Sequence, residues 1–323
     1  MRNFYIATVI LLVGLALGLT FRGKSVNLDL SSRIVAFGSD ISKLLQKSSE
    51  STNFENQRVK HAATMKQHLP SHLQAKIIGA ADKEQLRRLY DEVYNYLLRS
   101  NDQSSLTFIG NIYGRLEAKN WLKKNDIRSM HRLYLMFREF DKADAFRNRY
   151  PDQNLPLAPH ILSSENSGPH KAPNIRTIIR TTASNNSFEL SEVDFSSFTG
   201  VVIVANPECH FFKNFLKGIG TDPVMADAFI DNTIWLTGKG ASLTDNTIAD
   251  WNQSMPNIEF QIVYSETDWP EINYWGSPSF YFFEDTKLVS KVVGWPRGQE
   301  SQRKTALKNG FISVGINVWE AKQ

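Results

Sequence analysis

Thiol chemistry in this chain depends on a single residue. Cys209 is the only cysteine among the 323 residues, so no intramolecular disulfide can form. It lies in the stretch NPECHFF, directly after the apolar run Val201–Ala205. The pattern predicts that a strand buried on both faces ends here and that a helix begins near Cys209. Backbone N–H groups and the helix dipole at such a position favour the thiolate, which is the nucleophilic form of cysteine.

The residues beside the cysteine act in opposite directions. His210, if protonated, would stabilise a thiolate, whereas Glu208 disfavours a second negative charge next to it. Two plainer interpretations stay open. His210 is then a polar surface residue, and Cys209 is a small apolar residue buried at the start of a helix.

A second motif follows further along the chain. The stretch WGSPSF places Pro278 immediately before an aromatic-rich strand, and a cis peptide bond is one way to fit proline there. We expect Ser277 and Pro278, together with the nearby Trp269 and Trp275, to line a groove for a peptide or for glutathione.

In their order, these motifs resemble the thioredoxin superfamily. VVIVANPECHFF is similar to its first core strand and the start of its active-site helix, GSPSFYFF to its cis-proline loop, and LVSKVVGW to its last strand. The resemblance covers residues 200–316. It implies an α/β domain with a mixed sheet flanked by helices, in which Cys209 is the nucleophile and Pro278 shapes the substrate groove.

The chain departs from that family at one position. Redox-active members carry Cys-x-x-Cys, whereas Phe212 stands where the second cysteine would be. A mixed disulfide at Cys209 therefore has no internal thiol to release it. The resemblance then implies single-thiol chemistry: exchange assisted by glutathione as co-substrate, reaction with an oxidant through a sulfenic acid, or covalent capture of a protein or peptide partner. The alternative is a redox-inactive thioredoxin-like binding module or scaffold.

Other functional classes have weaker support. The excess of 37 Lys and Arg over 33 Asp and Glu is spread along the chain without basic runs, so we expect no nucleic-acid partner. His61, His68 and His72 lie close in sequence, but Pro70 interrupts the helix that would align them. We therefore expect no metal site, and no bound cofactor is indicated.

The N-terminus predicts a membrane or export segment. Phe4–Phe21 carries no charge and is flanked by Arg2 on one side and by Arg22 and Lys24 on the other. Residues 1–24 are thus expected to be an uncleaved anchor, with ALG at 16–18 leaving a removable signal peptide as the alternative. Either interpretation places the rest of the chain outside the cytoplasm, in the periplasm if the source is bacterial, or secreted after cleavage.

The remaining chain divides into three parts. Residues 25–150 have helical periodicity, as in the amphipathic stretch Lys83–Arg99, and we expect an all-α domain that recruits a partner. Its end, from Phe137 to Pro151, resembles half of a tetratricopeptide-type hairpin, and a helical bundle remains the alternative to a repeat array. Residues 151–174 are rich in Pro and Ser and predict a linker. Residues 175–323 form the thioredoxin-like domain.

Within that last domain the pattern changes from helical spacing to strands. The expected strands are Ile175–Thr181, Phe188–Val193, Val201–Ala205, Thr233–Leu236, Ile258–Tyr264, Ser279–Phe283 and Leu288–Val293. The expected helices run from Cys209 to Ile219, from Thr244 to Met255 and from Gln299 to Val318.

Overall fold

The computed structural model describes residues 69–100, 102–162, 174–182, 187–241 and 243–319, together with the single positions 32, 36, 39, 40, 65 and 67. The predicted membrane or signal segment, Phe4–Phe21, lies outside these residues, as do His61 and His68. Within the described ranges, no helix combines the length and the apolar character needed to cross a membrane.

The N-terminal part is a set of helices that pack around their own core. Their bounds are α4 Ser71–Ala80, α5 Lys83–Ser100, η1 Gln103–Ser105, α6 Leu106–Ala118, α7 Lys124–Met136, α8 Phe140–Arg149 and η2 Pro151–Gln153. Helix α5 confirms the amphipathic helix predicted over Lys83–Arg99. Helix α6 ends at Ala118, and Asn120 just after it adopts the left-handed conformation (φ 56°) that is common at helix ends.

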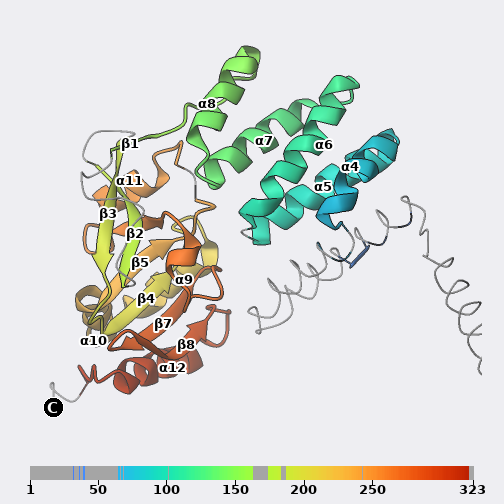
Figure 1. The fold of residues 1–323 in the computed structure, drawn as a ribbon. Helices are drawn as coiled ribbons and strands as arrows, with labels where there is room; N and C mark the ends of the chain where they lie inside the picture. Colours follow the sequence, from blue (N-terminus) through green and yellow to red (C-terminus); the bar gives the residue numbers. More distant parts are fainter. Residues whose placement is uncertain are drawn as a thin grey trace, which may run out of the picture.

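Consecutive helices of this part contact each other in chain order, α5 with α6, α6 with α7 and α7 with α8. Such an order occurs in bundles and in repeat arrays alike, so the tetratricopeptide resemblance stays a prediction. The helices α4 to α8 lie together beside the sheet-containing part (Figure 1).

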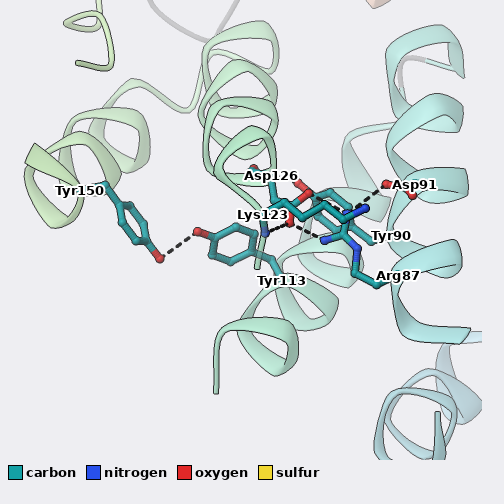
Figure 2. Close-up of polar contacts among 7 residues, drawn as sticks. All are labelled: Arg87, Tyr90, Asp91, Tyr113, Lys123, Asp126 and Tyr150. Atoms are coloured by element: carbon teal, nitrogen blue, oxygen red, sulfur yellow. Dashed lines mark hydrogen bonds and ion pairs between the residues drawn. The ribbon is translucent and has the colours of Figure 1, made fainter. Parts of the chain in front are cut away.

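Polar contacts fasten α5 to α7. The guanidinium of Arg87 forms an ion pair with Asp126, and the two side chains are only 11% and 5% exposed. The hydroxyl of Tyr90 donates to the backbone carbonyl of Asp126 at 3.1 Å. A further hydrogen bond joins α6 to the end of α8: the hydroxyl of Tyr113 donates to that of Tyr150 at 2.8 Å (Figure 2). Breaking a buried ion pair on one side leaves an uncompensated charge, so these contacts fix how the helices pack.

The C-terminal part is built on one mixed eight-stranded sheet of order β1-β3-β2-β6-β5-β4-β7-β8. Its bounds are β1 His160–Leu162, β2 Ile175–Thr181, β3 Ser187–Asp194, β4 Gly200–Val204, β5 Thr233–Thr237, β6 Phe260–Val263, β7 Ser279–Glu284 and β8 Lys287–Val293. The pairs β1/β3, β4/β5 and β5/β6 are parallel, and the other pairs are antiparallel. The predicted mixed sheet is confirmed, and β1 adds a strand within the segment expected to be a linker.

Helices flank this sheet, as predicted. They are α9 His210–Ile219, α10 Pro223–Asp231, α11 Thr247–Ser254, the short η3 Glu266–Asp268, and α12 Glu300–Ser313. Helix α10 was not predicted, although Asp222 caps it by accepting from the N–H of Met225, with Pro223 at its first turn. Helix α12 ends before the expected Val318, ahead of Gly315, which has φ 76°.

Strand β4 separates two cores. Val201 and Ile203 face the cluster beneath α9 and α12, whereas Val202 and Val204 face the cluster on the opposite side of the sheet. All four are at most 1% exposed, which confirms the prediction of a strand buried on both faces. Close packing against α12 requires glycine at Gly310, where a Cβ would lie 2.4 Å from the ring of Phe282.

Candidate functional site

Cys209 occupies the junction between β4 and α9. It is the N-cap residue of α9, with extended backbone angles (φ −69°, ψ 123°), and its carbonyl accepts the N–H of Lys213 at 3.0 Å. Its own N–H donates to the carbonyl of Asn206 at 2.9 Å, which closes the turn that follows the strand. The predicted strand-to-helix position of the cysteine is confirmed.

The proline loop lies directly beside this junction. The Ser277–Pro278 peptide bond is cis, as the sequence suggested. Because β7 pairs antiparallel with β4 and Ser279 lies opposite Val204, the loop before β7 meets the turn after β4 at one end of the sheet. Two sequence motifs that lie far apart in the chain therefore share one site.

Two hydrogen bonds join the motifs. The N–H of Asn206 donates to the Oγ of Ser277 at 2.9 Å. The Sγ of Cys209 lies 3.5 Å from the carbonyl oxygen of Ser277 and donates to it. The thiol is half-buried and packs against the core beneath α9. Cys209 and the residue before the cis-proline are thus in direct contact.

Tyr274 belongs to the same site, although the sequence reasoning did not single it out. Burial raises the pKa of its hydroxyl, and the nearby Cys209 raises it further. Gly276 follows the tyrosine because a Cβ there would lie 2.1 Å from the tyrosine ring. Its place beside Trp275 in the aromatic segment before Pro278 was the signal that could have found it.

The residues flanking the cysteine in sequence make their described side-chain contacts with other residues. His210 is exposed, and its ring centroid lies 3.8 Å from that of Phe211. Among the described contacts, none joins a nitrogen of His210 to the thiol. Glu208 faces Lys213 across 3.6 Å, and both side chains are largely exposed. An ion pair so exposed contributes little, about 0–1 kcal/mol.

One tryptophan of the predicted groove is misplaced. Trp269 is fully buried on the opposite face of the sheet, where its ring lies 5.6 Å from that of Phe195, so it cannot line a groove. The ring packs in the apolar core on the face of the sheet opposite Cys209. Its closeness to Pro278 in sequence was therefore a misleading signal. Trp275 is half-buried, but it packs against the same core as Trp269 and borders Gly238, so no described contact places it beside Cys209.

Phe212 is the residue at the position of a second cysteine. It is 0% exposed and packs against rings from β5, α11 and β6. Its ring centroid lies 6.0 Å from that of Trp235, 5.7 Å from that of Trp251 and 5.4 Å from that of Phe260. The side chain points into the core, so the site contains one thiol and an aromatic residue that supports α9.

Groups that hold a metal are not found here: the described residues contain no set of three or more His, Cys, Asp or Glu side chains that could bind one.

Comparison with known proteins adds little. No protein-family model and no curated protein matches the chain. Among solved structures, the crystal structure of a thioredoxin-like protein from Bacteroides caccae ATCC 43185 at 1.90 Å matches with 13% sequence identity, and the match covers 80% of this chain and 89% of that one. The TM-score is 0.25, so this likeness carries no argument about the site.

Proposed function

We propose that the C-terminal part is a thioredoxin-like domain that acts through the single thiol of Cys209. Several features support this. A buried strand leads to a cysteine at a helix start, the next strand on one side is parallel, and on the other side a hairpin begins with a cis-proline. The 3.5 Å contact between the Sγ of Cys209 and the carbonyl of Ser277 carries the proposal, because it joins the two motifs.

The proposed reaction is the formation of a mixed disulfide. The thiolate of Cys209 attacks one sulfur of a disulfide in a protein or peptide partner, a new S–S bond forms, and the other partner sulfur leaves as a thiolate that takes a proton from water. Release needs a second thiol from outside, such as glutathione, because Phe212 occupies the position of an internal one. That thiol attacks the mixed disulfide and restores the thiol of Cys209.

The test is a comparison of rates at one pH. Full-length protein and a synthetic peptide of residues 206–212 are each treated with oxidised glutathione, and intact mass follows the adduct. Both have the same neighbouring residues, but only the protein has the helix and the cis-proline loop. We expect the protein to react at least about tenfold faster, which corresponds to about 1.4 kcal/mol of barrier. A protein rate equal to or below that of the peptide would refute thiol chemistry at this site.

The same contact, considered as a hydrogen bond of the neutral thiol, favours a second function, a redox-inactive binding module. The thiol donates to the carbonyl of Ser277, and this hydrogen bond is lost when the thiol ionises. In that case the partly exposed surface at Cys209 and Ser277 would hold a peptide without covalent chemistry, whereas Pro278 itself is buried. Binding of a partner that persists after alkylation of Cys209, together with a protein rate no higher than that of the peptide, would support this function over the first.

We further propose that the chain is tethered to or exported across a membrane through residues 1–24. The support is the uncharged run Phe4–Phe21 with its basic flanks. The helical part would then present partners to the thiol outside the cytoplasm. A reporter fused after residue 323 that is active only in the cytoplasm would overturn this placement.

A further inference from the structure

A pocket of about 390 Å³ lies where the helices meet the sheet-containing part. It is formed by α7 and Arg138, by residues 154–156 after η2, and by residues 240, 241, 243 and 244, which follow β5. The thiol of Cys209 and the cis-proline loop take no part in it. The pocket exists only when the two parts are docked. In Figure 1, α7 and α8 lie nearer to the sheet than α4 and α5 do.

The charges that line this interdomain pocket have one sign. Arg128 and Arg132 lie one turn apart on α7 and are exposed, and Arg138 follows the end of that helix. None of the described residues that line the pocket is acidic. Guanidinium groups remain protonated at any physiological pH, so the pocket carries a permanent positive potential.

The guanidinium of Arg138 donates to two backbone carbonyls and keeps one N–H group that makes no hydrogen bond. Its guanidinium donates to the carbonyl of Leu135 at 3.3 Å and to that of Val263, in strand β6, at 3.0 Å. Its Nε is buried without a hydrogen-bond partner. Burial lowers the pKa of Arg138 to about 10, although Tyr264 and Glu266 act in the opposite direction. Among the described residues no carboxylate forms an ion pair with Arg138, and the charge of the nearby buried Glu266 balances that of the guanidinium only in part.

His131 adds a second unsatisfied group. Its side chain is 2% exposed, and its Nε2 has no hydrogen-bond partner. In the tautomer that carries its proton on Nε2, the ring can donate to a bound oxygen atom, which recovers the free energy that a buried N–H without a partner costs. The rest of the lining is mainly apolar, with Leu135, Met136, Leu155 and Leu243. The wall of the pocket thus combines oxyanion donors with apolar surface.

We propose that this interdomain pocket binds a small organic oxyanion, a carboxylate or phosphate group attached to a compact apolar body. The arginines bind the oxyanion and the leucine and methionine side chains bind the body. Bidentate contacts of guanidinium with carboxylate or phosphate are strong and directional, which favours these anions over halides. Because both parts of the chain line the pocket, the ligand also stabilises their docking.

The test uses titration calorimetry on the full-length chain with benzoate, phenyl phosphate and the neutral analogue benzamide. We expect saturable binding of at least one anion, and benzoate alone or phenyl phosphate alone would tell which group is recognised. The variant Arg128→Gln/Arg132→Gln should weaken binding about tenfold, because each ion pair between an exposed arginine and the bound anion contributes up to about 1 kcal/mol. The matched control is Arg88→Gln/Arg297→Gln, which removes two exposed arginines outside the pocket.

Each outcome decides the proposal. Binding that the pocket variant weakens and the control variant preserves supports it. The proposal is overturned if neither anion binds, if benzamide binds as tightly as benzoate, or if both double variants weaken binding equally. The result is independent of the thiol, because alkylated Cys209 should leave the titration unchanged.

Discussion

Replacing Phe212 tests whether the position of the second cysteine has become part of the core. The side chain is 0% exposed and its ring lies within 5.4–6.0 Å of four other rings, including that of Phe215. Truncating such a side chain removes its burial and leaves a cavity, so Phe212→Ala should lower the free energy of unfolding by about 3–5 kcal/mol. With a urea dependence of about 2 kcal/mol per molar, the midpoint of unfolding should fall by about 2 M.

Its neighbour in the chain provides the control. Phe211 is 40% exposed, and its described ring contact is with the exposed His210. Phe211→Ala should therefore cost no more than about 1 kcal/mol. Urea unfolding, followed by tryptophan fluorescence, gives both values under identical conditions. Equal losses in the two variants, or a loss below about 1 kcal/mol for Phe212→Ala, would refute the packing argument.

Three other perturbations test the helical part and the packing of α12. Asp126→Ala removes the buried ion-pair partner of Arg87 and should lower the free energy of unfolding by about 3–5 kcal/mol. Asp91 also pairs with Arg87, at 3.5 Å, but its side chain is 59% exposed. Asp91→Ala should therefore cost less than about 1 kcal/mol. Chemical denaturation measures both, and similar costs would contradict the buried ion pair. Gly310→Ala should cost about 1–3 kcal/mol because its Cβ would overlap a buried ring, whereas Gly114→Ala, in α6 with open space around it, should stabilise by about 0.5–1 kcal/mol. Thermal unfolding ranks the two, and the opposite order would be inconsistent with the packing. Burial lowers the pKa of His131 below 6.5, with Asp144 raising it and Arg147 lowering it further. The unfolded chain then binds more protons than the folded chain below pH 6.5, so stability falls as the pH drops from there. His131→Asn should make stability less dependent on pH in this range, and an unchanged slope in urea titrations would count against it.

The sequence predicted where Cys209 and Pro278 lie relative to the strands and helices, because the signals for these positions are local. A continuous apolar run indicates a strand buried on both faces, and the residues after Val204 end that strand. A proline before an aromatic strand similarly indicated the loop at Pro278, and its cis bond is confirmed. That the two motifs touch depends on the antiparallel pairing of β4 and β7, which the periodicity of the sequence could not show.

Other features could not be predicted, because they depend on long-range packing. Trp269 lies close to the proline loop in sequence, but the sheet turns its ring toward the opposite core. The interdomain pocket unites His131 and Arg138 from the helical part with Leu243 from a loop of the sheet part. The spacing of residues within one segment does not predict that these residues come together, because each of them occupies an ordinary helix or loop position in its own segment.

The solitary thiol is therefore a property of the core as well as of the motif. Phe212 lies on α9 at the position of a resolving cysteine, but its ring fills space between Trp235, Trp251 and Phe260. Phe212→Cys would complete a Cys-x-x-Cys sequence and, in its reduced form, should lose about as much stability as Phe212→Ala, because cysteine fills little of that volume. Restoring two-thiol chemistry would require smaller changes at several of these rings together. The residue three positions after Cys209 is therefore determined by packing in the aromatic core as well as by the motif.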